Sequence, residues 1–285
     1  MKKKWISLTL VAVLALSILA LAGCSKTEQL QIAVPNDTTN EARALLLLEE
    51  NGIITLKEGA GITATKNDIE ENPYNVEIVE TEAAQIPNVL QDVDYAVINS
   101  NYAINAGLNP IEDSLVIEGA ASEYVNILAV KEGNENSDKI KALVAALQSQ
   151  QVADYISETY GGSVVSVIDA PGDGYDTSID YDALAGQTIT VAASPTPHAE
   201  ILAVAQEILA ARDITLDIQE YSDYVVPNNV VEDGTVDANY FQHLPYLEDF
   251  NAENGTHLVS AVAVHVEPMG LYGGKQTTLD AVSGK

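Results

Sequence analysis

Arginine is scarce in this 285-residue chain, which has only Arg43 and Arg212. The planar guanidinium of arginine can hold a carboxylate through two parallel hydrogen bonds, which lysine cannot do. Arg43 lies early in a predicted helix, on the side where the preceding strand ends, so it could bind a small anionic ligand. An ordinary ion pair with Glu41 or Glu49 explains Arg43 equally well. Arg212 ends a predicted helix, where a cation stabilises the helix dipole, and we expect a structural role for it.

Aromatic and polar residues gather near strand ends in the second half of the chain. Residues 237–243 read Asp-Ala-Asn-Tyr-Phe-Gln-His, and Tyr221 and Tyr224 lie shortly before them. Rings at a cleft can enclose an apolar or sulfur-containing side chain, and each sulfur–aromatic contact is worth about 0.3–1.5 kcal/mol. The alternative is that these rings belong to a hydrophobic core.

The four histidines form no recognisable metal motif. None lies four residues from another, and neither His-Glu-x-x-His nor Cys-x-x-Cys occurs. His198, His243 and His265 nevertheless fall near predicted strand ends. A three-histidine zinc site across a cleft therefore remains an alternative.

No motif points to catalysis. Residues 273–275 (Gly-Gly-Lys) lack the upstream glycine of a phosphate-binding loop, and no Gly-x-Ser-x-Gly turn occurs. We therefore expect a protein that is not an enzyme and needs no cofactor.

The first 24 residues have the pattern of a lipoprotein signal peptide. Lys2, Lys3 and Lys4 precede an apolar run from Trp5 to Leu21, which ends in Leu-Ala-Gly-Cys. This ending resembles a lipobox, in which the cysteine thiol receives a diacylglycerol before cleavage. A membrane-spanning helix is the alternative, but the apolar run is shorter than the roughly 20 residues that a span prefers. We expect residues 1–23 to be removed and Cys24, the only cysteine, to anchor the protein on the extracytoplasmic face of the cell membrane.

The net charge excludes nucleic acid as a partner. The chain carries 42 acidic and 13 basic residues, for a net charge of −29, and loss of the three signal lysines gives −32. Such a surface repels nucleic acid and anionic lipid. About 262 residues remain after residue 23, enough for one large or two medium domains, and no further segment is long and apolar enough to cross a bilayer.

Strands and helices alternate along the mature chain, which indicates an α/β fold with parallel sheets. The predicted strands are 31–34, 76–79, 95–99, 124–130, 188–193, 215–220, 236–241 and 258–266. The predicted helices are 37–51, 82–91, 137–148, 149–160, 198–212, 226–232 and 245–254, of which 82–91 is expected to bend or start near Pro87. Residues 169–182, rich in Asp, Gly and Pro, are the best linker candidate. Two α/β lobes facing each other would create a cleft lined by strand ends and helix N-termini, where a small polar ligand binds.

Several segments resemble the NlpA family, the methionine-binding lipoproteins of ABC importers. The longest are 193–202 (Ala-Ser-Pro-Thr-Pro-His-Ala-Glu-Ile-Leu), 237–243, 265–272 (His-Val-Glu-Pro-Met-Gly-Leu-Tyr) and 34–48, which begins Val-Pro-Asn-Asp-Thr-Thr-Asn. The runs 97–99 and 124–126 complete the set. In the family, however, the Ser-Pro-x-Pro-His segment comes first and the Pro-Asn-Asp segment follows the Pro-Met-Gly-Leu-Tyr segment. The exchanged order makes this chain look like a circular permutant.

The resemblance implies a two-lobe, type II periplasmic-binding-protein fold in permuted form. One lobe would comprise residues 31–123 plus 272–285, and the other residues 124–271, with the family's usual ends joined through 169–182. Residues 24–30 would be a tether. Hinge crossings would lie near 124–126 and 269–272, and permutation is tolerated where the old ends are close and the new break is an exposed loop.

The resemblance also implies roles for individual residues. Arg43 would hold the ligand carboxylate, and Asn126 with Asn99 or Asn101 would bind its amino and carboxyl groups. The walls of the side-chain pocket would be Tyr224, Tyr240, Phe241 and His243. The expected function is capture of methionine or a similar amino acid for an ABC permease and its ATPase. The alternatives are a zinc-binding lipoprotein, an anchored hydrolase, and a ligand-free sensor or adhesin.

Overall fold

The computed structural model describes residues 29–119 and 123–283. The predicted signal peptide, the lipid-bearing Cys24 and residues 24–28 of the predicted tether lie outside the described residues. Within the described part of the chain, no helix has the length and apolar character needed to cross a membrane.

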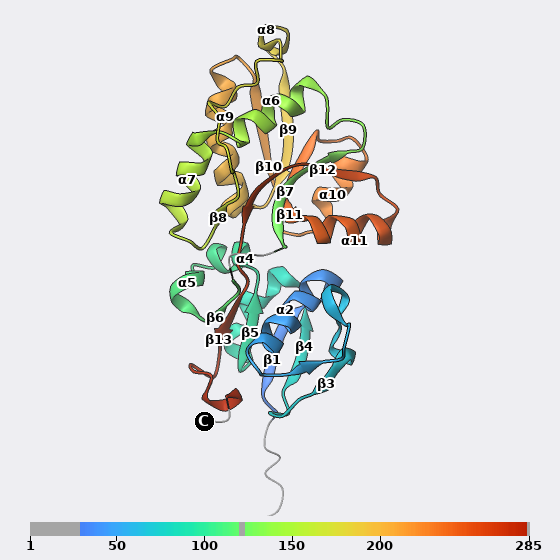
Figure 1. Ribbon diagram of the computed structural model, residues 1–285, viewed down its shortest axis with the longest axis vertical. Helices are drawn as coiled ribbons and strands as arrows, with labels where there is room; N and C mark the ends of the chain where they lie inside the picture. The colour runs from blue at the N-terminus through green and yellow to red at the C-terminus, as the bar shows by residue number, and fades with distance from the viewer. Residues whose placement is uncertain (1–28, 120–122, 284–285) are drawn as a thin grey trace, which may run out of the picture.

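The described residues form two α/β lobes, each built on its own sheet (Figure 1). The smaller sheet has the order β4-β1-β5-β13-β6 and the larger one β10-β9-β11-β7-β12-β8. The smaller sheet consists of β1 Gln31–Pro35, β4 Glu77–Thr81, β5 Tyr95–Ile98, β6 Ser114–Ile117 and β13 Gly270–Gly273. The larger sheet consists of β7 Val125–Lys131, β8 Val165–Ser166, β9 Thr188–Ala193, β10 Thr215–Glu220, β11 Ala238–His243 and β12 Leu258–Val266. A separate ribbon pairs β2 Thr55–Leu56 with β3 Ile69–Glu71. The predicted two-lobe α/β fold is confirmed.

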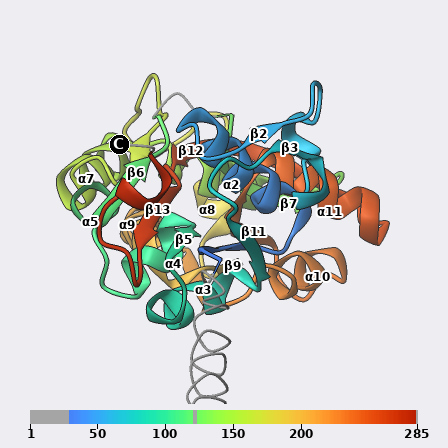
Figure 2. The same ribbon diagram turned by 90° about the horizontal axis from the view of Figure 1, so that it is seen from below.

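Helices cover both faces of each sheet. Those of the first lobe are α2 Thr38–Glu50, α3 Ile86–Val89, α4 Ser100–Asn105 and α5 Pro110–Asp113. Those of the second lobe are α6 Asp138–Leu147, α7 Gln150–Tyr160, α8 Tyr181–Leu184, α9 Glu200–Ala210, α10 Val226–Glu232 and α11 Leu244–Asn254. Figure 2 shows α2 and α3 on opposite sides of the smaller sheet. Alternating residues of β1 agree with this arrangement, because Ile32 and Val34 pack in the core under α2 while Ala33 packs with Ile86 of α3.

The chain passes between the lobes at two places. The first crossing joins β6, which ends at Ile117, to β7, which begins at Val125. The second joins β12 to β13 and consists of residues 267–269 alone (Figure 1). Two short crossings of this kind allow lobes to rotate about a shared hinge.

The expectation of purely parallel sheets is wrong, because both sheets are mixed. Strands β4, β1 and β5 are parallel, but β13 runs antiparallel to both β5 and β6. In the larger sheet β10, β9 and β11 are parallel, whereas β7 is antiparallel to β11 and β12. Strand β13 enters from the other lobe without a helical connection, so nothing forces it into the parallel direction that helical crossovers impose.

Most predicted elements are confirmed within one or two residues. The strands 188–193, 215–220 and 258–266 and the helix 226–232 have the predicted bounds. The helix predicted for residues 82–91, bent or started near Pro87, is confirmed in its start but not in its length, because α3 begins at Ile86 and covers only four residues between two 3₁₀ turns. Pro87 lies in the first turn of α3, where its missing N–H is tolerated, and cannot continue a helix from before it.

Serine caps position the two helices that follow β7. The Ser137 hydroxyl accepts a hydrogen bond from the Ile140 N–H at the start of α6, and the Ser149 hydroxyl accepts from Val152 at the start of α7. Helix α7 then ends at Gly161, whose φ of 55° suits a residue without a side chain. These caps explain why two helices form where one long apolar pattern would allow a single helix.

We predict that Ser149→Ala lowers the free energy of unfolding by about 1 kcal/mol, because it leaves the Val152 N–H without its capping partner. Ser149 is fully buried, so water cannot replace the lost hydroxyl. Urea denaturation measures the change, with Ser137→Ala as the comparison at a more exposed cap. A Ser149→Ala midpoint equal to that of the wild type would contradict this assignment.

Candidate ligand-binding site

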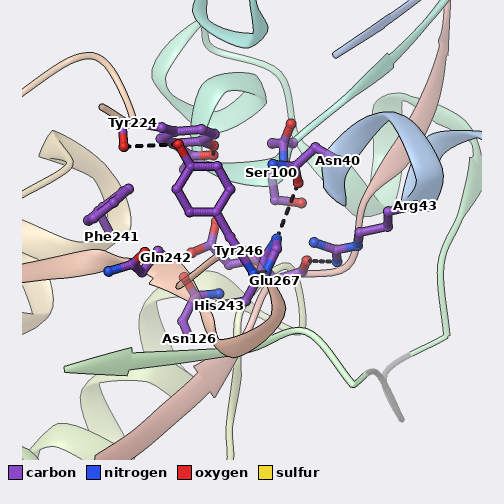
Figure 3. A pocket seen from close by; sticks show the side chains of 12 residues that line it. Asn40, Arg43, Ser100, Asn126, Tyr224, Phe241, Gln242, His243, Tyr246 and Glu267 are labelled. Atoms are coloured by element: carbon purple, nitrogen blue, oxygen red, sulfur yellow. Dashed lines mark hydrogen bonds between the residues drawn. The ribbon is translucent and has the colours of Figure 1, made fainter. Parts of the chain in front are cut away.

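A pocket lies between the two sheets and takes its lining from both lobes (Figure 3). The first lobe contributes Asn40 and Arg43 of α2 and Asn99, Ser100 and Asn101 at the end of β5. The second lobe and the crossing after it contribute Asn126, Tyr224, Phe241, Gln242, His243, Tyr246 and Glu267. The site is thus formed at the carboxyl ends of β5 and β11 and at the first turns of α2, α4 and α11, the position where α/β folds bind small polar ligands.

The structure brings seven of the eight predicted site residues to this pocket. These are Arg43, Asn99, Asn101, Asn126, Tyr224, Phe241 and His243. Tyr240 is not among the lining residues, so its predicted place in the pocket wall is wrong. Its side chain packs in the core of the second lobe, on the other face of the sheet. The strand has a bulge at Phe241, because Tyr240 pairs with Leu128 while Gln242 pairs with the next residue, Ile127.

Sequence reasoning missed five lining residues, namely Asn40, Ser100, Gln242, Tyr246 and Glu267. Two of them had a local signal. Asn40 lies three residues before Arg43 and therefore on the same side of a helix, and Ser100 lies between two predicted site residues. Nothing in the local pattern separates Glu267 from the many other acidic residues, because its role depends on burial.

Arg43 is buried and its charge is neutralised inside the protein. Its Nε donates to Glu118 Oε1 at 3.1 Å, and its Nη2 forms an ion pair with the same carboxylate. Nη2 also donates to the backbone carbonyl of Glu267 at 2.7 Å. The guanidinium carbon lies 4.3 Å from the centre of the Tyr124 ring. This leaves Nη1 as the guanidinium nitrogen with no hydrogen-bond partner among the described residues.

The ion-pair partners that the sequence suggested for Arg43 are wrong. Glu41 accepts a hydrogen bond from the Lys66 backbone N–H, and Glu49 accepts from that of Leu56. Both carboxylates therefore close loops around α2 rather than neutralising the arginine.

An asparagine–histidine chain fixes the amide of Asn99. His243 Nδ1 accepts from the Tyr246 N–H at 3.2 Å, so its Nε2 carries the proton and donates to Asn40 Oδ1 at 3.2 Å. The same Asn40 oxygen accepts from Asn99 Nδ2 at 2.8 Å, while Asn40 Nδ2 donates to Asp37. Asn99 Oδ1 is then a buried acceptor with no partner among the described residues, on a side chain that lines the pocket.

Aromatic rings close one side of the pocket. The Tyr224 ring centre lies 5.8 Å from that of Phe241 and 5.8 Å from that of Tyr246 (Figure 3). The Tyr224 hydroxyl donates to Asn101 Oδ1 at 2.7 Å. Phe241 and Tyr246 are buried in a small cluster of their own. The rings therefore form both a core and a ligand wall, and the two readings of the sequence are compatible.

A second polar cluster lies behind the pocket. His198 Nε2 and His265 Nε2 lie 3.2 Å and 2.7 Å from Glu267 Oε1, and the three groups could hold a metal ion by their spacing. His243 does not belong to this group, so the three-histidine set that the sequence left open is wrong in one member. The contacts to Glu267 are ordinary hydrogen-bond distances, which protons on the two imidazoles explain without a metal ion.

Burial dominates the electrostatics of this cluster. It lowers the pKa of both His198 and His265 to about 3, so both imidazoles are neutral at pH 7. Burial also raises the pKa of Glu267, and His198, Arg43 and the Asn101 backbone N–H act in the opposite direction. The Glu267 carboxyl group lies against His198 and His265 through Oε1, and Glu267 is also one of the residues that line the pocket.

The pocket can bind a small molecule that carries opposite charges at one end and an apolar group at the other. Arg43 supplies a positive, hydrogen-bond-donating side, while Asn99 Oδ1 and Glu267 supply acceptors. Tyr224, Phe241 and their neighbours supply an apolar wall. A zwitterion with an apolar side chain has this distribution of charge.

Comparison with known proteins finds a matching family and several relatives. A family model described as NlpA lipoprotein matches residues 25–168 and 189–285. Membrane lipoprotein TpN32 of Treponema pallidum is 47% identical over 135 residues, which are 47% of this chain and 50% of the relative. The D-methionine-binding lipoprotein MetQ of Salmonella typhimurium is 44% identical over 137 residues, 47% of this chain and 51% of the relative. The chain thus spans about half the length of the curated relatives it matches.

Solved structures give a similar partial match. A nutrient-binding protein from Burkholderia cenocepacia, bound to methionine, is 46% identical and matches 50% of this chain and 61% of that chain, with a TM-score of 0.47. A lipoprotein from Ruminococcus gnavus is 60% identical over 48% of this chain and 58% of that chain, also with a TM-score of 0.47.

The buried histidines predict a pH dependence of stability. A histidine whose folded-state pKa lies below its unfolded value stabilises the fold above the unfolded pKa, and this contribution is lost as the pH falls toward the folded pKa. Since burial lowers the pKa of His265 from 6.5 to about 3, its contribution should fall by about 1.4 kcal/mol per pH unit below about pH 6.5.

Denaturant titrations at pH 7, 6 and 5 test this on the wild type and on His265→Gln. The difference in unfolding free energy between the two should shrink by about 0.7 kcal/mol from pH 7 to pH 6 and by about 1.2 kcal/mol from pH 6 to pH 5, because the full slope is reached only below the unfolded pKa. His257→Gln is the control, because the His257 side chain is 67% exposed. A wild-type advantage that is constant from pH 7 to pH 5 would show that His265 does not resist protonation.

Proposed function

Given that the chain belongs to the NlpA lipoprotein family, we propose that it is a membrane-anchored, extracytoplasmic binding protein that captures methionine or a similar amino acid between its lobes. The captured ligand would pass to an ABC permease and its ATPase. The relatives named D-methionine-binding lipoprotein support the ligand class, at 42–44% identity over about half of this chain.

The observation that carries the proposal is the separation of donors and acceptors in the pocket. The ligand carboxylate would bind at Arg43 Nη1, the nitrogen that Glu118 and the Glu267 carbonyl leave free. The ligand ammonium would bind between Asn99 Oδ1 and the Glu267 carboxyl group, both of them buried acceptors. Charge-assisted hydrogen bonds in a site shielded from water are stronger than neutral ones.

The aromatic wall suits an unbranched, sulfur-containing side chain. Tyr224, Phe241 and Tyr246 present ring faces and edges at centre-to-centre spacings of 5.8 to 6.1 Å. A thioether gains favourable contacts at ring edges and adapts to irregular spaces because its chain is flexible. Other apolar amino acids of similar length would fit less well but are not shut out by charge.

Hydrogen bonds between the lobes support capture by closure. Asn40 of the first lobe bonds to His243 of the second, and Asn101 of the first bonds to Tyr224 of the second. The Tyr102 hydroxyl also donates to the Ser222 carbonyl at 3.1 Å. These contacts border the pocket, so ligand entry and release would require them to open about the two crossings.

A circular permutation would explain how the match is divided. The family model matches two separate segments, and single alignments to the curated relatives stop at about half their length. We propose lobes at residues 31–123 plus 272–285 and at 124–271, with 169–182 joining the family's usual ends. Removal of residues 1–23 and lipidation of Cys24 would attach the first lobe to the membrane through residues 24–30.

Isothermal titration of the soluble protein, residues 25–285, with L-methionine tests the proposed function. We predict a dissociation constant between nanomolar and micromolar, which corresponds to roughly −12 to −8 kcal/mol. D-methionine and leucine, titrated in the same way, measure the selectivity for chirality and for the thioether. Absence of binding heat up to millimolar L-methionine would rule out the proposed ligand.

Arg43→Lys tests the carboxylate contact, because it keeps the charge but loses the geometry of the guanidinium. We predict that affinity for L-methionine falls by about 1.5–3 kcal/mol, as expected when a hydrogen bond to a charged group is lost while the charge itself is kept. Arg212→Lys is the matched control, since Arg212 lies over the Tyr175 and Tyr181 rings and outside the pocket lining. Equal affinities for the two variants would remove Arg43 from the site.

A further inference from the structure

His198 is a buried side chain that touches the pocket only through another residue. It is 1% exposed and is not among the lining residues. Its Nε2 lies 2.9 Å from Oδ1 of Asn126, which does line the pocket, and 3.2 Å from Glu267 Oε1. Its other ring nitrogen, Nδ1, has no hydrogen-bond partner among the described residues.

The proton positions in this cluster follow from one end of the chain of hydrogen bonds. Among the described residues the buried Tyr240 hydroxyl has His265 Nδ1 as its one hydrogen-bond partner. A proton on Nδ1 would leave the hydroxyl proton as a buried donor without an acceptor, so we place the hydroxyl proton toward an unprotonated Nδ1. His265 must then carry its proton on Nε2, where it donates to Glu267 Oε1 at 2.7 Å. Glu267 Oε1 is therefore an acceptor.

This fixes the tautomer of His198. In the tautomer with the proton on Nδ1, the unprotonated Nε2 would direct its lone pair at the acceptor Glu267 Oε1. The Nδ1 proton would then be a buried donor without an acceptor. With the proton on Nε2, both nearby oxygens are acceptable partners and only a bare Nδ1 remains unpaired. Burial, which lowers the pKa of His198 to about 3, keeps the ring neutral in this tautomer.

The tautomer of His198 in turn fixes the amide of Asn126. An N–H donor at 2.9 Å requires the amide oxygen to face His198, so the NH₂ group of Asn126 faces away from it, on the pocket side. The backbone of Asn126 has little freedom, because β7 pairs there with His243 of β11 and His265 of β12. Asn126 thus presents donors to the ligand.

We propose that His198 is a positioning residue for ligand binding, which holds the Asn126 amide so that its NH₂ group donates to the ligand carboxylate beside Arg43. This inference rests on the proposed function, because it assigns a specific group of an amino-acid ligand to Asn126. It adds a residue that contacts no ligand and yet sets what the pocket accepts. Removal of the His198 donor would free the amide to turn its oxygen toward the carboxylate.

A double-mutant cycle tests the proposal by titration with L-methionine. His198→Phe keeps the ring but removes the donor, and should weaken binding at least about tenfold when Asn126 is present. In the Asn126→Ala background the same substitution should change affinity less than about twofold, since the group that it positions is gone. His198→Gln retains an N–H donor and should bind within about threefold of the wild type. Equal losses from His198→Phe in both backgrounds would overturn the proposal.

A measurement on the unmodified protein decides the case even where His198→Phe fails to fold. ¹⁵N NMR of histidine-labelled wild-type protein distinguishes the two neutral tautomers and the cation. The proposal requires a neutral His198 protonated on Nε2 between pH 6 and 8. The Nδ1-protonated tautomer or an imidazolium would overturn it. Failure of the wild type to bind methionine would instead count against the proposed function, and the NMR result would stand independently.

Discussion

The pocket depends on one buried cation. An arginine withdrawn from water is costly unless its charge and its donors are paired. Arg43 is paired by the Glu118 carboxylate and by the Glu267 carbonyl, and it lies against the Tyr124 ring. Glu118 also accepts from the Met269 N–H at 3.2 Å. Glu118 belongs to one crossing between the lobes, and residues 267 and 269 belong to the other. The group that would bind the ligand therefore also ties both hinge segments to α2.

The remaining polar groups of the site have fixed orientations because each has a second partner. The hydrogen bond from His243 fixes the orientation of the Asn40 amide, and Asn40 in turn fixes the orientation of the Asn99 amide. Tyr240 fixes the tautomer of His198 through the His265–Glu267 pair. Buried amides left free to flip would present either a donor or an acceptor at the same place. In this protein the hydrogen-bond network removes that choice, so the pocket offers acceptors on one side and donors on the other. The proposed selectivity for a zwitterion would then be a property of the fold rather than of the lining residues alone.

The alternation of strands and helices is local information and predicted the α/β lobes, while the resemblance to the NlpA family implied most residues of the candidate site. Strand–helix alternation and the motifs around Arg43 and residues 237–243 place these elements without knowledge of the tertiary structure. The predictions that failed depend on contacts between residues that are distant in the sequence. The ion-pair partner of Arg43 is Glu118, which lies 75 residues away in the sequence. Glu267 lines the pocket because the fold buries it there. Tyr240 does not line the pocket because the bulge at Phe241 changes which side chains of β11 face the pocket. The residue pattern of the strand does not predict this bulge. The antiparallel β13 likewise depends on a crossing between lobes.

A crystal structure of the soluble protein grown with L-methionine tests the central claim most directly. The account predicts a ligand between the lobes, with its carboxylate at Arg43 Nη1, its ammonium between Asn99 Oδ1 and Glu267, and its thioether against Tyr224 and Phe241. A ligand bound in the reverse direction, with its ammonium toward the guanidinium, or one bound outside this pocket, would contradict it.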